Sequence, residues 1–178
     1  MNIANKLTIF RVVLVPFFVV FALYDITAYS RYIALAIFII ATVTDKLDGT
    51  IARKYNMVTT FGKFMDPIAD KLLVCSALVC LTAKGEIPAW AVIIIVAREF
   101  IISGIRIIAA EAGVAIAASS WGKAKTVSQM VMTIVILLNI DFLYVPEQIL
   151  IYLSLVLTVI SATDYLIKNK NVLSIKDK

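Results

Sequence analysis

The chain contains no histidine and only two cysteines among its 178 residues. Without histidine it lacks the commonest general base and the commonest protein ligand of zinc. Cys75 and Cys80 lie in one apolar run, off the i,i+4 helical spacing and without other metal ligands beside them. We interpret both as small buried apolar side chains rather than as redox or metal-binding groups. A proton-transferring group or a metal ligand must therefore be sought among the carboxylates.

Charge is also scarce, since 16% of residues are charged and 62% are apolar, with a mean hydropathy of +0.97. Soluble domains have about a quarter charged residues and about half apolar ones. The excess of apolar residues predicts a protein of the lipid bilayer. The net charge of +5 is spread between apolar segments, which favours basic cytoplasmic loops over a nucleic-acid interface. The first apolar run lacks a small-residue cleavage site after it, so we expect a retained first span.

Six apolar segments approach the roughly 20 residues that a helix needs to cross a bilayer. We therefore predict an all-α integral membrane protein with six transmembrane helices, in which residues 1–178 form a single domain. The predicted spans cover residues 7–24, 32–51, 64–83, 89–110, 121–140 and 149–167.

The basic residues between these spans predict the orientation of the chain. Six spans place both termini on one side, and only Arg31 and Lys84 are basic on the other side. Basic loops gather on the cytoplasmic side of membrane proteins. Both termini should therefore be cytoplasmic, as should the charged residues at the same ends of the spans. The basic residues on this side are Lys6, those of segment 53–63, Lys123, Lys125, Lys168, Lys170, Lys176 and Lys178.

Four aspartates lie in or beside the second and third predicted spans. Asp45 and Asp48 are three residues apart, and Asp66 and Asp70 are four apart, so each pair shares one face of a helix. A carboxylate in a membrane segment costs a few kcal/mol or more and faces a partner or a polar cavity. Divalent cations would relieve the repulsion among four carboxylates, and oxygen ligands suit Mg²⁺, Mn²⁺ or Ca²⁺. Two such ions could clamp a pyrophosphate.

Two glycines and an arginine accompany the aspartates. Gly49 and Gly62 leave room for a nucleotide to approach the backbone, and Arg53 could bind a phosphate bidentately. One alternative is that the aspartates form structural ion pairs at helix ends, with Arg53 and with Lys46, Lys63 and Lys71. Another is a cation-coupled transporter, because intramembrane acids also line ion pathways.

The spacing of these residues resembles the signature of the CDP-alcohol phosphotransferase family, at all eight fixed positions. It reads Asp45-x2-Asp48-Gly49-x2-Ala52-Arg53-x8-Gly62-x3-Asp66-x3-Asp70. The resemblance implies a six-helix membrane bundle, a homodimer, and transfer from a CDP-linked lipid to an alcohol with release of CMP.

Roles for individual residues follow from the same resemblance. Asp45, Asp48 and Asp66 would ligate metal, and Asp70 would ligate a second metal ion and act as the general base. Contacts to the CDP-lipid would come from Gly49, Arg53, Thr59 and Gly62. The base is chemically reasonable because an alcohol is a poor nucleophile near neutral pH. The choice of Asp70 over Asp66 depends on the family alone.

Three further segments, residues 5–11, 97–106 and 122–126, resemble the branch of this family that uses CDP-diacylglycerol and sn-glycerol 3-phosphate. Ala4 departs from the proline that is common there. Arg98 and Arg106 are eight residues apart and fall on nearly one helical face, and such a cluster of positive charge favours a dianionic phosphate. The residues predicted to hold the acceptor phosphate are Thr8, Arg11, Lys63, Arg98, Arg106, Lys123 and Lys125.

Alternatives for the acceptor stay open. The same chemistry could use phosphatidylglycerol, serine or inositol phosphate. Arg98 could instead pair with Glu99 or Glu111, and Lys123 and Lys125 could serve as topology anchors.

Overall fold

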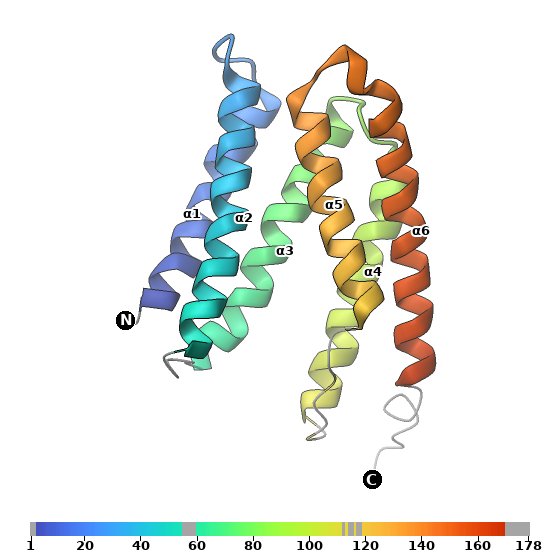
Figure 1. The fold of residues 1–178 in the computed structure, drawn as a ribbon. Helices are drawn as coiled ribbons and strands as arrows, with labels where there is room; N and C mark the ends of the chain where they lie inside the picture. The colour runs from blue at the N-terminus through green and yellow to red at the C-terminus, as the bar shows by residue number, and fades with distance from the viewer. Residues whose placement is uncertain (1–2, 55–59, 112, 114–115, 117–118, 170–178) are drawn as a thin grey trace. The chain divides into compact units, whose positions relative to one another are not determined.

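The computed structural model describes residues 3–54, 60–111, 113, 116 and 119–169, without the side chains of residues 3–6, 45–54, 60–67, 70 and 111. All regular structure in these ranges is helical, which confirms the predicted all-α class (Figure 1). Each predicted apolar segment falls on one long helix. The helices are α1 (Ile3–Leu23), α2 (Ser30–Lys54), α3 (Thr60–Ala83), α4 (Ala89–Glu111), α5 (Ser120–Leu138), the short 3₁₀ helix η1 (Asp141–Leu143) and α6 (Tyr144–Lys168).

The helices group into two compact units. Unit 1 comprises Met1–Ile87 and Thr133–Ile140, and unit 2 comprises Pro88–Met132 and Asp141–Lys178. Helix α5 contributes its first part to unit 2 and its last part to unit 1. That residues 1–178 form one domain stays a prediction.

In unit 1, α1 packs along both α2 and α3. Its buried face repeats at spacings of three and four residues, as expected for a helix with one packed side. Phe18 on this face meets Phe38 of α2, with ring centroids 6.0 Å apart. Alanines on the facing side of α2 let the backbones approach closely, as in other membrane helix pairs. The buried face of α1 consists of Thr8, Arg11, Val15, Phe18 and Ala22, and the small residues of α2 are Ala34 and Ala41.

Helix α3 ends in a glycine turn that positions a carboxylate. Gly85 has φ +76°, its N–H donates to the Thr82 carbonyl, and the Glu86 N–H donates to the Leu81 carbonyl. This pair of bonds is the Schellman arrangement, in which a left-handed residue after the helix satisfies the last carbonyls. The turn leads Glu86 to Arg31 of α2, whose Nη1 and Nη2 donate to the two carboxylate oxygens at 2.6 and 3.0 Å.

The same arginine also caps α5. Arg31 Nε donates to the Leu137 carbonyl at 3.1 Å, and Nη2 donates to the Ile136 carbonyl. These carbonyls belong to the last turn of α5, where carbonyls lack the usual donor four residues on, and the Ile136 carbonyl also accepts from the Asn139 N–H at 3.1 Å. A cation at this end also interacts favourably with the helix dipole. Arg31, which the sequence suggested only as a topology marker, therefore ties α2, the turn after α3 and the end of α5 together.

Replacing Arg31 with methionine is expected to destabilise the protein by about 2 kcal/mol, because Glu86 and two carbonyls lose a charged donor. In thermal unfolding of the detergent-solubilised protein, this corresponds to a midpoint about 5 °C lower. Lys84→Met is the control, because Lys84 Nζ pairs with Asp25 Oδ1 at 3.3 Å and the Asp25 side chain is 78% exposed. Equal midpoints for the two variants would show that the Arg31 contacts add nothing.

In unit 2, α4 packs against α6. Ile102 and Ile105 of α4 surround Tyr165 of α6, and Ile116 packs against this cluster. The buried face of α6 is largely polar, although the helix as a whole is apolar. Its members are Ile151, Ser154, Thr158, Ser161 and Tyr165, again at alternating spacings of three and four residues.

Large apolar side chains cover much of the outer surface of the helices. Phe17 on α1, Ile93 on α4 and Val156 on α6 are each more than half exposed. Among the described residues, one helical segment, Asp141–Lys168, is long and apolar enough by itself to cross a membrane. The apolar helices indicate a membrane protein, while the count of six spans stays a prediction. Three shorter helical stretches are also apolar: Leu7–Leu23, Ser30–Thr44 and Lys71–Ala83.

Candidate active site

The four aspartates lie in helical backbone at one end of unit 1. Asp45 and Asp48 belong to the second half of α2, and Asp66 and Asp70 belong to the first half of α3. Because α2 runs toward the connection at residues 55–59 and α3 runs away from it, both pairs occupy the same end of the unit (Figure 1). The helices are continuous through these positions, so the spacings of three and four place each pair of positions on one face.

The other predicted ligands of the CDP-lipid belong to the same segments. Gly49 and Arg53 lie in α2, and Gly62 lies in α3, as does Lys63, predicted for the acceptor. Thr59 lies outside the described residues. The side chains of the aspartates and of these residues are likewise not described, so their roles stay predictions.

The donor set decides which metal ions suit the site. Four carboxylates without histidine or thiolate are hard oxygen donors, which fit Mg²⁺ or Mn²⁺. Where side chains are described, no group of three or more His, Cys, Asp or Glu residues could hold a metal ion. The aspartates of α2 and α3 therefore stay the predicted metal ligands.

Two predicted acceptor ligands, Thr8 and Arg11, are fully buried on the packed face of α1. They belong to the first half of α1, and α1 begins at the same end of unit 1 as the aspartate segments (Figure 1). A fully buried arginine is rare in proteins unless its charge is compensated. The burial of Arg11 therefore places a positive charge inside the helix packing of unit 1.

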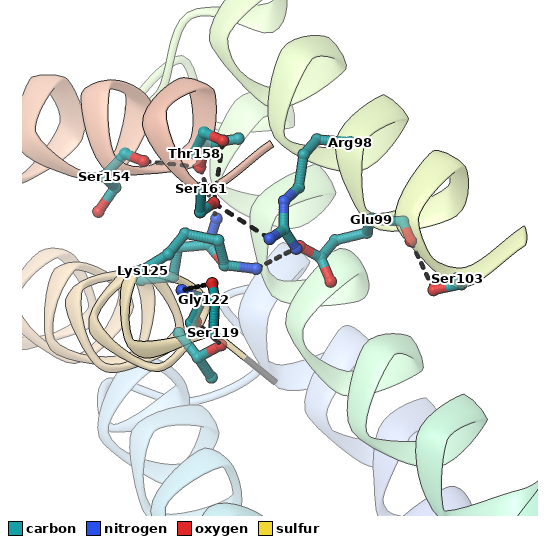
Figure 2. Close-up of polar contacts among 11 residues, drawn as sticks. Arg98, Glu99, Ser103, Ser119, Gly122, Lys125, Ser154, Thr158 and Ser161 are labelled. Carbon is teal, nitrogen blue, oxygen red and sulfur yellow. Dashed lines mark hydrogen bonds and ion pairs between the residues drawn. The ribbon is translucent and has the colours of Figure 1, made fainter. Parts of the chain in front are cut away.

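Two more predicted acceptor ligands, Arg98 and Lys125, meet at a carboxylate in unit 2. Glu99 Oε1 accepts from Arg98 Nη1 at 2.9 Å and from Lys125 Nζ, and Arg98 Nη2 donates to Ser161 Oγ at 3.0 Å (Figure 2). The side chains of Arg98, Glu99 and Lys125 are only 12, 15 and 3% exposed. The Arg98–Glu99 ion pair, raised above as an alternative, is therefore present, together with a second cation on the same oxygen.

The first turn of α5 lies close to Arg98. Ser119 caps this helix, because its Oγ accepts from the Gly122 N–H at 3.1 Å. A Cβ atom at Gly122 would stand 3.8 Å from Arg98 Nη2 and 3.5 Å from Ser119 Oγ. This region therefore combines the positive end of the α5 dipole with two cations and one carboxylate. Its net charge is positive, which favours an anion.

The remaining predicted acceptor ligands of unit 2 are more open. The Arg106 guanidinium lies over the Tyr165 ring, 5.6 Å from its centroid, and Arg106 itself is exposed. Lys123 is exposed at the start of α5. The structure therefore joins Arg98 to Lys125 through Glu99 and places Arg106 on an aromatic ring of α6.

Three residues of this region were missed by sequence reasoning as members of a site: Glu99, Ser161 and Tyr165. Glu99 directly follows Arg98, which was a visible signal but suggested only a competing ion pair. Ser161 and Tyr165 are four residues apart and continue the spacing of Ser154 and Thr158 along α6. That periodicity was present in the sequence within an otherwise apolar helix.

Residues 1–160 match the model of the CDP-alcohol phosphatidyltransferase family, which is nine-tenths of the chain. The chain belongs to this family of membrane-associated enzymes. Several relatives similar to it over nearly their full length are named CDP-diacylglycerol–glycerol-3-phosphate 3-phosphatidyltransferase. The Bacillus subtilis protein is 40% identical over 94% of this chain and 95% of its own length. The Haemophilus influenzae protein is 44% identical, over 93% and 91%. The Rickettsia bellii protein is 37% identical, over 92% and 93%.

Proposed function

We propose that the protein transfers the phosphatidyl group of CDP-diacylglycerol to sn-glycerol 3-phosphate, giving phosphatidylglycerophosphate and CMP for phosphatidylglycerol synthesis. The observation that carries this proposal is the near full-length similarity to relatives named for this reaction, two of which are 40 and 44% identical to the chain. The complete aspartate signature on α2 and α3 supports the same chemistry.

In this reaction, the primary hydroxyl of glycerol 3-phosphate attacks the β-phosphorus of CDP-diacylglycerol, and CMP leaves. Asp70 takes the hydroxyl proton as the new phosphoester bond forms, because an unassisted alcohol is a weak nucleophile. Arg53, Gly49, Thr59 and Gly62 hold the CDP-lipid so that its β-phosphorus faces the acceptor. Such positioning accounts for much of the rate in phosphoryl-group transfer.

Asp45, Asp48, Asp66 and Asp70 would hold the divalent ions, Mg²⁺ or Mn²⁺ and two in number. When bound, these ions neutralise the pyrophosphate and the charge that develops on the leaving CMP. The four carboxylates support the proposal, because a pyrophosphate substrate could not approach them without intervening cations.

Recognition of the acceptor phosphate is assigned to Arg98, Arg106, Lys123 and Lys125, together with Lys63 and with Thr8 and Arg11 of α1. The charges around Glu99 support this assignment, since the half-buried Arg98 and the buried Lys125 share one carboxylate and retain a net positive charge. A serine or choline acceptor would not need such a cluster, whereas a phosphate dianion binds it through charge-assisted hydrogen bonds.

We further propose that the protein spans the plasma membrane six times, as a homodimer with both termini and the active site in the cytoplasm. The distribution of basic residues supports this orientation. In unit 1, exposed tyrosines gather at the connection between α1 and α2, at the end opposite the aspartate segments. Aromatic side chains favour the membrane–water interface, so this end would lie at the outer surface. These residues are Tyr24, Tyr29 and Tyr32.

A panel of acceptors tests the proposal. Purified protein receives CDP-diacylglycerol and Mn²⁺ or Mg²⁺ with glycerol 3-phosphate, phosphatidylglycerol, serine or inositol phosphate in turn, and CMP release is measured. We expect release with glycerol 3-phosphate. Release with another acceptor only would overturn the acceptor assignment, and release with none would favour the cation-transport alternative.

A further inference from the structure

Helix α6 holds a row of buried polar side chains to which the reaction above assigns no role. Ser154, Thr158 and Ser161 are fully buried, Tyr165 is 2% exposed, and the four follow one helical face. Polar groups inside a membrane bundle are costly unless they have partners, and they commonly mark function. Ser161 and Tyr165 also lie just beyond residues 1–160, where the family model matches.

The first half of this row joins α6 to α5. The hydroxyls of Ser154 and Ser128 are 2.8 Å apart, and Gln129 Nε2 donates to Thr158 Oγ1 at 3.4 Å (Figure 2 includes Ser154 and Thr158). These contacts connect two helices without involving a cation. They hold α6 against the helix that carries Lys125.

The second half of the row contacts the two arginines of α4. Ser161 Oγ donates to the Thr158 carbonyl at 3.0 Å, which directs its lone pairs toward Arg98 Nη2, also at 3.0 Å. Tyr165 presents its ring to Arg106 and is itself fixed between Ile102 and Ile105. Helices α4 and α6 run in the same direction within unit 2, so the order of the contacts along both helices agrees (Figure 1).

We propose that Ser161 and Tyr165 are positioning residues, which hold Arg98 and Arg106 in the orientation that binds the acceptor phosphate. This inference rests on the proposed function. A free arginine side chain loses rotamer entropy when it binds an anion, and prior fixation removes much of that cost from binding. Tyr165 acts through its ring, because its hydroxyl is buried and has no hydrogen-bond partner among the described residues.

Steady-state kinetics of single variants test this inference. For Ser161→Ala and for Tyr165→Leu we expect the KM for glycerol 3-phosphate to rise about fivefold, with kcat and the KM for CDP-diacylglycerol unchanged within about twofold. Inhibition by inorganic phosphate, competitive with the acceptor, should weaken by the same factor. Tyr165→Phe keeps the ring and should behave as the wild type. Thr163→Ala removes a hydroxyl from the exposed side of α6 and is the matched control.

The outcomes separate the inference from the proposed function. Wild-type protein that makes no product from glycerol 3-phosphate would overturn both. An active wild type whose acceptor KM is unchanged in Ser161→Ala and Tyr165→Leu would overturn the inference alone. A variant could instead show lower kcat, lower kcat/KM for both substrates and a lower unfolding midpoint. That result would show a merely structural role and would also overturn the inference.

Discussion

Asp70→Asn is expected to lower turnover by about 10³-fold, within the range that a lost general base costs. The asparagine keeps the size of the side chain but cannot take the proton of the acceptor hydroxyl. It would also withdraw one anionic oxygen ligand from the proposed metal centre. CMP release from CDP-diacylglycerol with glycerol 3-phosphate measures the effect, at saturating concentrations of both substrates.

Metal titration distinguishes the two parts of this role. Asp66→Asn removes only a metal ligand, so raised Mn²⁺ should restore much of its turnover by mass action. Asp70→Asn should remain slow at the same Mn²⁺ concentration, since added metal does not replace a base. Full recovery of Asp70→Asn, or turnover equal to the wild type at any metal concentration, would refute the assignment of the base.

Glu99→Gln is expected to destabilise unit 2 by about 3 kcal/mol, because the removal of one member of a buried ion cluster leaves like charges uncompensated. Arg98 and Lys125 both donate to Oε1 of this carboxylate, and their side chains are 12 and 3% exposed. With a neutral amide between them, the two cations repel one another in a medium of low dielectric constant. Thermal unfolding in detergent should show a midpoint about 10 °C below the wild type.

Asp25→Asn is the matched control for this change, since it makes the same exchange of carboxylate for amide in an exposed pair. The Asp25 side chain is 78% exposed, and its Oδ1 lies 3.3 Å from Lys84 Nζ. Such surface pairs contribute at most about 1 kcal/mol to the free energy of unfolding. Similar midpoints for Glu99→Gln and the wild type would mean that the cluster is solvated or rearranges, contrary to its buried contacts.

The sequence predicted the helices well, because each is a long apolar run with a clear interruption at either end. The predicted segment 89–110 corresponds to α4 at Ala89–Glu111, and the segment 64–83 to α3 at Thr60–Ala83. The larger difference is at α6, which begins at Tyr144 rather than near residue 149. Glu147 and Pro146 in its first turn concealed this start, although an acidic residue and a proline are both favourable there.

The site was predicted unevenly, for a physical reason. The aspartate signature is local, since its spacing within two neighbouring helices is legible from the chain alone. The contact of Lys125 with Glu99 joins residues 26 apart, and that of Arg98 with Ser161 joins residues 63 apart. Which helix faces another depends on side-chain packing over the whole unit, and apolar composition does not specify it. Likewise Arg31 is one basic residue in a charge count until its carbonyl partners on α5 are known.

The most direct test of the proposed phosphatidyl transfer is to identify the lipid product in the presence and absence of a divalent metal ion. Purified protein would be incubated with CDP-diacylglycerol and ¹³C-labelled sn-glycerol 3-phosphate, with Mn²⁺ or with EDTA, and the lipids analysed by mass spectrometry. The proposed function predicts ¹³C-labelled phosphatidylglycerophosphate in amounts equal to the CMP released, in the presence of the metal ion and not with EDTA. CMP release without label in the lipid, or equal product in EDTA, would contradict it.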